Sequence, residues 1–371
     1  MTGRREFFHG LTGAALMLQG GQLWSQDEKA IPFLGAPAAN APRRGMVWDE
    51  LTSWTTPTDG VFAVQHYGVP EADLSNSKLA ISGLVSKPLT LSMEQIKARP
   101  QVEHTVTIEC SGNGPTGPLI GNSKWAGTPL APILKEAGVK PEGIEVVFFG
   151  ADTGTEKIRD ADYKQNFARS LSLEDAMKSN VLLCYEQNGQ PLNKAHGGPL
   201  RLVVPGWYGV AWVKWLDRIE IHDRKFQGRF MARDYVTLRG EKQGDQTIWR
   251  ETSVGKMNLK SVAARVTRSG SGPAKITGAA WSDGTAIAKV EVRIDDGAWR
   301  PAQLVANRDA FAWTFWSLNW TDVKPGEHSV VSRAVDAKGR VQPTPDDPFI
   351  TQKKSRWENN QQAVRKILIE G

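Results

Sequence analysis

The stretch that decides the fold is Thr105-Val106-Thr107-Ile108-Glu109-Cys110-Ser111-Gly112-Asn113-Gly114. Its first four residues are β-branched and predict a strand, while the glycines and asparagine after Cys110 predict a turn. A thiol is therefore expected at a strand end, facing a loop. This placement favours a reactive or metal-ligating thiolate; the alternative is a small buried apolar side chain.

The size and composition of the chain limit the classes of protein it can be. Its 371 residues are enough for two globular domains. The 46 Lys and Arg against 40 Asp and Glu give a net charge of +6, too small and too dispersed to favour a nucleic-acid-binding protein. Cys110 and Cys184 could pair in an oxidising compartment. Because Cys184 lies in the apolar run 181–185, it is predicted instead to be a buried strand residue.

The amino terminus has the order of a twin-arginine export signal. Arg4 and Arg5 precede two phenylalanines and a short apolar segment, residues 11–18. That segment is too short to cross a bilayer, so no membrane span is expected. Residues 1–26 are interpreted as a signal that carries a folded protein to the periplasm; the alternative is a basic amino-terminal tail.

The next part of the chain predicts an extended arm and then a mixed domain. Residues 27–59 are rich in proline, alanine and glycine and show no sustained period, which is typical of an arm. Residues 60–254 are predicted to form an α+β domain. Strands are expected at 61–70, 78–85, 105–109 and 144–150, and helices at 91–96, 128–138 and 172–177.

From about residue 255 the pattern becomes that of an all-β module. Short strands are predicted at 259–266, 274–281, 287–294, 311–318 and 328–335. Residues 289–294 alternate cleanly and lead into an Asp-Gly turn. Five such strands over about 100 residues predict an immunoglobulin-like β-sandwich, assigned to residues 255–371.

A group of cations lies between residues 184 and 221. His196, Arg201 and Lys214 stand among glycines and short strands, after an Asn-Gly hairpin turn. Three cations with backbone N–H groups from glycine turns suit a phosphate or pyrophosphate. Taken singly, each is more often a surface or satisfied residue, so the prediction depends on their grouping.

Together with the strand-end cysteine, these segments resemble the sulfite oxidase family of molybdenum enzymes, over roughly residues 60–250 and on into the second domain. The resemblance implies a molybdopterin-binding domain followed by a dimerisation domain, and thus a homodimer. It makes Cys110 the protein's ligand to molybdenum, and it places Tyr235 and Asp234, from the run Arg233-Asp234-Tyr235, in the catalytic centre. It also implies that the carboxy-terminal segment, through Trp357, reaches this centre. The cofactor-binding residues that it implies are Gln65, His66, Cys110, Ser111, Asn113, Asp152, His196, Arg201, Trp212, Val213 and Lys214.

The sequence departs from the family at the arginines that bind the sulfite anion. The corresponding positions hold Val64 or Gln65, Pro115 or Thr116, and Asn359 or Asn360. A doubly charged oxyanion in a partly desolvated site needs compensating charge. Cations on other loops that could replace the arginines are Lys157, Arg159, Arg169 and Arg233.

The function implied by the resemblance is that of an exported molybdenum-dependent oxidoreductase. It would carry out oxygen-atom transfer to sulfite or a related small sulfur compound and pass electrons to a c-type cytochrome. No Cys-x-x-Cys-His motif occurs, so no c-type haem is expected in this chain, nor a haem domain ahead of residue 60. Three alternatives stay open: a sulfane dehydrogenase subunit acting on protein-bound sulfur, a sulfoxide reductase, and a cofactor-free periplasmic binding protein.

Overall fold

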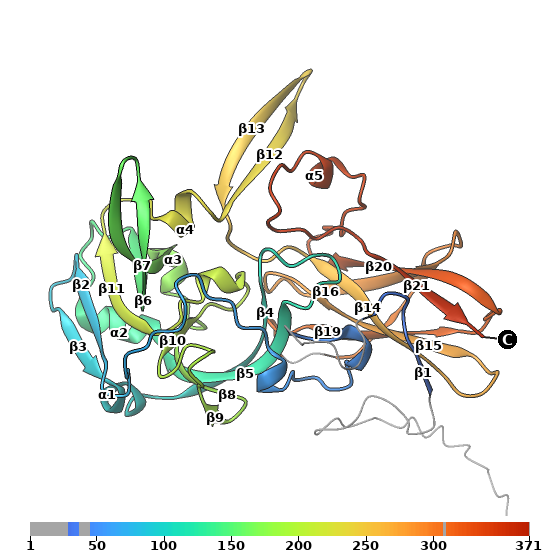
Figure 1. Cartoon of the computed structure of the whole chain (residues 1–371), viewed down its shortest axis with the longest axis horizontal. Helices are drawn as coiled ribbons and strands as arrows, with labels where there is room; N and C mark the ends of the chain where they lie inside the picture. Colours follow the sequence, from blue (N-terminus) through green and yellow to red (C-terminus); the bar gives the residue numbers. More distant parts are fainter. Residues whose placement is uncertain (1–28, 37–44, 307–308, 371) are drawn as a thin grey trace, which may run out of the picture.

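The structure is a computed structural model and describes residues 29–36, 45–306 and 309–370. Figure 1 shows two strand-rich halves, the first domain mainly in cyan to yellow and the second in orange to red, with the blue strand β1 lying against the second. The predicted α+β class is confirmed. The predicted export signal, residues 1–26, lies outside the described residues. No helix in the described part of the chain is long and apolar enough to cross a membrane.

Two five-stranded sheets form the first domain. One has the order β3-β2-β11-β6-β7, and β2 and β11 run parallel. Its strands are β2 (Lys78–Gly83), β3 (Leu89–Ser92), β6 (Glu145–Ile158), β7 (Ala161–Ser172) and β11 (Leu216–His222). The other has the order β10-β8-β5-β4, with β9 paired to β8. Its strands are β4 (Val102–Glu109), β5 (Ile120–Pro129), β8 (Leu182–Gln187), β9 (Gln190–Pro191) and β10 (Arg201–Val203).

The helices of the first domain are short and begin or end at the predicted signals. Helix α1 (Met93–Lys97) follows Ser92, whose hydroxyl takes part in a capping box. Helix α2 (Leu130–Ala137) ends at Gly138. This residue has φ +67°, the left-handed backbone conformation that glycine commonly adopts at the carboxy-terminal end of a helix. With α3 (Leu173–Ala176), all three predicted helices are confirmed. The short 3-10 helices are η1 (Trp48–Glu50), η2 (Thr58–Gly60) and η3 (Gly209–Ala211).

The strand predicted at residues 61–70 is wrong, because this segment is irregular. Val61 and Phe62 are buried in the core through their side chains. The Val61 carbonyl accepts a hydrogen bond from a ring nitrogen of His196 at 3.1 Å instead of joining a ladder. Tertiary contacts therefore override the β propensity of this segment.

The second domain is a sandwich of two sheets, as predicted. One sheet has the order β1-β14-β15-β19-β18 and the other β17-β16-β20-β21. The first consists of β1 (Lys29–Ile31), β14 (Lys260–Arg268), β15 (Ala274–Trp281), β18 (Gln303–Leu304) and β19 (Thr314–Trp320). The second consists of β16 (Ile287–Ile294), β17 (Arg300–Pro301), β20 (Gly326–Asp336) and β21 (Val364–Ile369).

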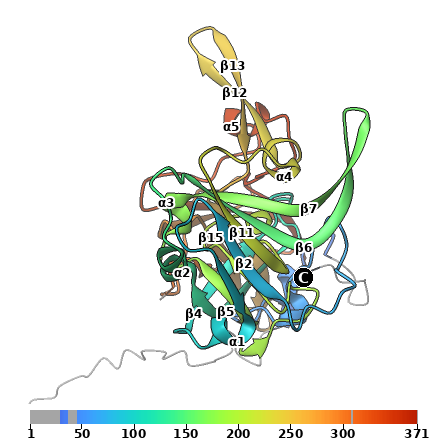
Figure 2. The same ribbon diagram turned by 90° about the vertical axis from the view of Figure 1, so that its left-hand side faces the viewer.

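A two-stranded hairpin projects from the body between the domains. It comprises β12 (Val236–Gln243) and β13 (Gln246–Ser253), and Figures 1 and 2 both show it standing clear of the sheets. The segment that carries α5 (Pro348–Thr351) lies near its base, and α4 (Arg229–Ala232) directly precedes it.

The amino-terminal arm is part of the second domain. Strand β1 pairs antiparallel with β14, and Phe33 lies in the apolar core of the sandwich. The guanidinium of Arg365 lies 3.8 Å from the Phe33 ring centroid and pairs with Asp49 at 2.8 Å. Residues predicted only as an extended arm therefore complete a sheet that is distant in sequence.

One apolar cluster extends from the first domain into the second, beside the sandwich's own core. Trp281 and Trp313 of the second domain belong to the same buried cluster as Ile108 of the first. Trp48 stacks on Trp281 with ring centroids 5.8 Å apart, and the Thr107 N–H donates to the Phe311 carbonyl at 3.0 Å. The strand that carries the thiol is thus packed directly against the second domain.

Truncation of Phe33 tests whether the arm is docked. Phe33→Ala is expected to lower the free energy of unfolding by about 3 kcal/mol or more, since it removes a buried ring from the sandwich core. The matched control is Leu34→Ala, because Leu34 is 49 % exposed and its loss should change stability by less than about 0.5 kcal/mol. Urea unfolding of both variants measures the difference; equal effects would contradict the docking of the arm.

Candidate functional site

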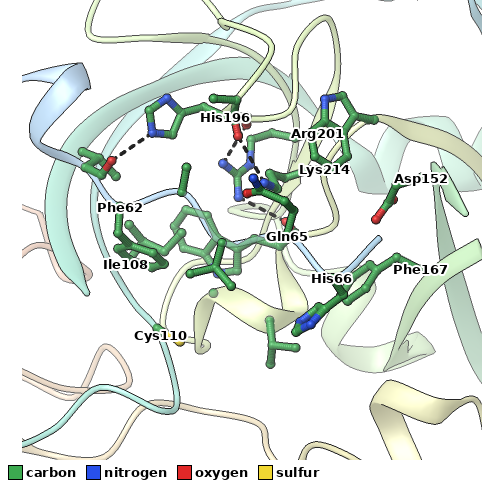
Figure 3. A pocket seen from close by; sticks show the side chains of 18 of the residues that line it. Phe62, Gln65, His66, Ile108, Cys110, Asp152, Phe167, His196, Arg201 and Lys214 are labelled. Carbon is green, nitrogen blue, oxygen red and sulfur yellow. Dashed lines mark hydrogen bonds between the residues drawn. The ribbon is translucent and has the colours of Figure 1, made fainter. Parts of the chain in front are cut away.

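A cleft in the first domain brings most of the predicted site residues together. It encloses about 670 Å³, open solvent at its mouth included. Figure 3 shows Cys110 at one side of this cleft and His196, Arg201 and Lys214 at the other. The predicted residues that line it are Gln65, His66, Cys110, Asp152, His196, Arg201, Trp212, Lys214 and Tyr235.

Four predicted residues lie outside the lining. The Asp234 carboxylate accepts from Arg229 Nε at 2.7 Å, so it belongs to an ion pair beside the cleft. Asn113 bonds within the cysteine loop and holds its shape. Ser111 and Val213 are buried, and the Ser111 hydroxyl has no hydrogen-bond partner among the described residues.

Cys110 follows β4 directly, where the backbone turns away from the sheet. Its N–H donates to the Leu119 carbonyl at 2.9 Å, and the Gly112 N–H bonds its thiol. Burial raises the pKa of the Cys110 thiol, and this backbone bond opposes the rise. Cys110 and Cys184 are both free in this structure, and Cys184 is a buried residue of β8, as predicted.

Tyr235 and His66 form a neutral hydrogen-bonded pair in the cleft. The Tyr235 hydroxyl lies 2.9 Å from His66 Nε2, and the imidazole is stacked against Phe167 and Phe230. Burial lowers the pKa of His66, a shift that Asp234 opposes, and burial raises the pKa of Tyr235. When the ring carries its proton on Nδ1, Nε2 accepts the hydroxyl proton.

The carboxy-terminal segment reaches this part of the site, as the resemblance implied. The indole of Trp357 stacks on the Tyr235 ring with centroids 4.4 Å apart. The next residue, Glu358, donates its N–H to the Ser111 carbonyl at 2.7 Å. Residues more than 240 positions beyond the thiol therefore fix one side of its loop.

The cations at the other end of the cleft are desolvated. The Arg201 guanidinium donates to the carbonyls of His196 and Trp212 at 2.9 and 3.1 Å, and its Nε has no partner among the described residues. Burial lowers the pKa of Arg201 to about 10. Burial and then the charge of Arg201 lower the pKa of Lys214 to about 7.

Asp152 is the acidic group that faces Lys214. Its side chain is buried, and one carboxylate oxygen has no hydrogen-bond partner among the described residues. Burial raises the pKa of Asp152 to about 6, while its own backbone N–H and Lys214 oppose the rise. The cleft therefore holds an unmet acceptor on Asp152 and an unmet donor on Arg201, while Lys214 Nζ donates to the Ala195 carbonyl at 3.1 Å.

These unmet groups fit a ligand that is anionic at one end. Arg201 is buried and Lys214 is half-buried, and neither has a salt bridge to a carboxylate among the described residues, which is costly for the buried guanidinium unless an anion enters. The free thiol at the far side supplies a soft ligand for a transition metal. A pterin that carries a phosphate at one end and molybdenum at the other matches both ends of the cleft.

None of the cations predicted as arginine replacements lines the cleft: Lys157, Arg159, Arg169 and Arg233. Arg169 is buried and donates to the carbonyls of Phe230 and Val254, so it is used within the fold. Asn360, at the predicted third position, is also structural, because its amide donates to the Leu259 carbonyl.

The sequence prediction missed Arg356. Its charge acts to lower the pKa of Cys110 and of Tyr235, although burial outweighs it in both groups, and Arg356 is not among the residues that line the cleft. Its guanidinium lies over the Trp357 ring, 4.4 Å from the centroid, and its side chain is exposed. The signal that could have found it is its position directly before Trp357. The position that the family pattern gives to its third arginine holds Asn359 or Asn360, as predicted, and Arg356 lies a few residues before it.

Two family matches cover most of the chain. Residues 66–230 match the family described as "Oxidoreductase molybdopterin binding domain", and residues 251–353 match "Mo-co oxidoreductase dimerisation domain". The chain is 30 % identical over 317 residues to the sulfite oxidase of Gallus gallus, covering 78 % of this chain and 68 % of that one. It is also 32 % identical to the mitochondrial sulfite oxidase of Rattus norvegicus. That alignment covers 78 % of this chain but only 58 % of the length of the rat protein.

A solved structure matches nearly the whole chain. It is the sulfane dehydrogenase SoxCD from Paracoccus pantotrophus, with a TM-score of 0.74 and 28 % sequence identity. The match covers 99 % of this chain and 96 % of that one. Both domains thus have counterparts in one related protein.

Asp152→Asn tests the electrostatics of the cleft in the cofactor-free chain. Because the folded-state pKa of Asp152 is raised to about 6, the native state binds the extra proton and the parent loses stability as the pH rises from about 4 to 6. The variant lacks this loss, so it should be more stable than the parent by about 1–3 kcal/mol above pH 6 and no more stable below pH 4. Urea unfolding at several pH values measures the gap.

The control for this prediction is Asp234→Asn, which alters a carboxylate already paired with Arg229. That variant should show no gain in stability above pH 6. A stability difference between Asp152→Asn and the parent that does not vary with pH would contradict the prediction.

Proposed function

Because the chain belongs to the sulfite oxidase family of molybdopterin oxidoreductases, we propose that it is a molybdenum-dependent enzyme that oxidises a small sulfur compound by oxygen-atom transfer. The observation that carries this proposal is the cleft, with a free thiol at one side and desolvated cations at the other. Fold alone would not decide the chemistry, since one fold serves many reactions.

The residues of the cleft divide into those for the metal and those for the pterin. Cys110 would ligate molybdenum as a thiolate, a ligand type that such metals favour. His196, Arg201 and Lys214 would bind the phosphate of the pterin, and the free oxygen of Asp152 would accept from its ring N–H groups. When bound, the cofactor supplies two-electron oxidation of sulfur with an oxygen atom that comes from water.

Tyr235 and His66 would hold a proton beside the reacting atoms. Both groups are neutral at pH 7, because burial shifts their pKa values in opposite directions. The tyrosine hydroxyl therefore keeps its proton, and with the imidazole proton on Nδ1 it donates a hydrogen bond to His66 Nε2. Stacking of Trp357 on Tyr235 fixes the phenol ring and keeps bulk water from that face.

Arg356 would attract an anionic substrate to the thiol end of the cleft. It is the cation whose charge acts on both Cys110 and Tyr235, and Gln65 supplies only a neutral amide to the lining. One guanidinium is less charge than the three arginines of the family pattern, so the substrate is expected to carry less negative charge than sulfite or to be larger.

A second candidate substrate class is protein-bound sulfane sulfur. It is favoured by the match of almost the whole chain to the sulfane dehydrogenase from Paracoccus pantotrophus. The absence of arginine at Gln65 and Pro115 agrees with a substrate other than free sulfite.

The amino terminus and the second domain indicate where the protein works and with which partners. The paired Arg4 and Arg5 before an apolar segment support export to the periplasm by the twin-arginine route. There, two electrons from each turnover would leave singly to a c-type cytochrome. The second domain, which matches a dimerisation family, supports a homodimer. Electron transfer to cytochrome c and light scattering test these points.

Metal analysis combined with stopped-flow absorbance tests the central proposal. Protein from a host that makes the molybdenum cofactor should hold about one molybdenum per chain. Rapid reduction by sulfite would support a sulfite dehydrogenase. Reduction only by a persulfide-bearing protein would support a sulfane dehydrogenase. A chain without molybdenum would leave only a binding protein.

Cys110→Ala is expected to lower turnover by more than about 100-fold, because loss of a metal ligand should exceed the effect of losing a supporting residue. The matched control is Cys184→Ala, since that thiol is fully buried in β8. The control should keep turnover within about threefold of the parent while losing some stability. Unchanged turnover in Cys110→Ala would overturn the assignment of the ligand.

Arg356→Gln is expected to raise KM for an anionic sulfur substrate about tenfold or more, because it removes a charge-assisted hydrogen bond. Arg356→Lys should recover part of the loss. The control is Arg233→Gln, which removes an equally exposed charge that acts on Glu156 and is not among the charges that act on Cys110 or Tyr235. Steady-state kinetics at constant ionic strength measures both; equal KM values for Arg356→Gln and the parent would contradict the role.

A further inference from the structure

A buried polar cluster joins the two domains one residue before the thiol. Glu109 Oε1 accepts from Lys260 Nζ at 2.5 Å and from Asn113 Nδ2 at 3.1 Å. Its Oε2 accepts from Trp281 Nε1 at 2.9 Å. Glu109 is completely buried, and Lys260 and Trp281 are each 1 % exposed. We call these four residues, Glu109, Asn113, Lys260 and Trp281, the inter-domain cluster.

The inter-domain cluster holds both sides of the cysteine turn. Glu109 is the last residue of β4, and Asn113 accepts the Leu119 N–H on the far side of the turn at 3.0 Å. Lys260 Nζ also approaches the Gly114 carbonyl at 3.4 Å. Two of the groups that fix residues 109–114 therefore come from β14 and β15 of the second domain.

Stability alone is a poor explanation for such an ion pair. Burial of two charges costs several kcal/mol per ion, and apolar side chains of similar volume often serve stability as well or better. The surrounding apolar core already joins the domains through Trp48 and Trp281. What a carboxylate with three directed donors adds is orientation, because each hydrogen bond restricts the direction of the backbone that follows.

We propose that Lys260 and Trp281 are positioning residues for Cys110, so that the second domain sets the orientation of the metal-ligating thiol through Glu109. The domain matched as a dimerisation module thereby completes the cofactor site of its own chain. The inference rests on the proposed function in taking Cys110 as the ligand. It goes beyond that function in assigning the orientation of the thiol to the other domain.

Lys260→Gln, and the pair Glu109→Gln with Lys260→Gln, test the proposal. The single variant leaves a buried carboxylate without its cation, whereas the double variant removes both charges and keeps one amide oxygen that can accept from Asn113 and from the amide at position 260, at the expense of the acceptor of Trp281 Nε1. The matched control is Asp336→Asn, which alters an equally buried carboxylate paired with Arg340 inside the second domain. If Lys260→Gln fails to fold, Trp281→Phe removes one donor and keeps most of the ring.

Three readouts separate positioning from stability, all on the full chain. They are molybdenum content, the Mo(V) electron paramagnetic resonance spectrum of the holoprotein, and the rate of iodoacetamide alkylation of Cys110 in chain made without the cofactor. Cys184, which is fully buried, is the unreactive reference in the same digest. The first two readouts depend on molybdenum binding, whereas the alkylation rate tests the positioning even if the chain binds no metal.

The single variant is expected to show an altered Mo(V) spectrum, molybdenum content lower by up to about tenfold, and a changed alkylation rate. The double variant should return all three toward the parent, and Asp336→Asn should lower only the melting temperature. A Lys260→Gln variant that melts earlier but keeps the parent's spectrum and alkylation rate would overturn the inference. A double variant that fails to recover them would do the same.

Discussion

The structure depends most on a buried carboxylate that two domains must satisfy together. Glu109 is fully buried directly before the thiol, and its donors come from the cysteine turn, β14 and β15. Leaving this buried charge unpaired would remove a large part of the free energy that stabilises the folded state. The second domain therefore cannot move away from the first without exposing or unpairing this group, and the thiol is fixed where the domains meet.

At the cation end of the cleft, far from the thiol, the charged groups are not paired as Glu109 is. Arg201 is buried and Lys214 is half-buried, neither forms a salt bridge among the described residues, and their pKa values fall to about 10 and about 7. Asp152 alone is too little counter-charge, since one of its oxygens also lacks a partner. Positive charge that the protein itself does not balance, with shifted pKa values, is typical of a site that binds a charged ligand. It agrees with membership of a family that binds a phosphate-bearing pterin.

The thiol end differs from the family pattern through a few residues. Val64 or Gln65, and Pro115 or Thr116, stand where the family pattern has sulfite-binding arginines, while Arg356 lies over the Trp357 ring in the carboxy-terminal segment. Both chemistries that we propose use this geometry, because the Tyr235–His66 pair serves any sulfur nucleophile equally. The candidate substrates are therefore distinguished by how many positively charged side chains stand at the thiol end of the cleft and where they stand. The redox centre would be the same for both.

The sequence by itself determined the local elements: the strand that ends before Cys110, the helix after Ser92, the turn at Gly138 and the two-domain order, because caps, turns and alternation act over a few residues. Resemblance added nine of the 19 residues that line the cleft. Only the tertiary structure decided the irregular path of residues 61–70, the docking of β1 on the sandwich, the position of Asp234 beside the cleft and the role of Arg356. The same holds for Glu109 and Trp281, which bond across 172 residues of chain. Such contacts depend on how distant segments pack, and no short-range pattern encodes them.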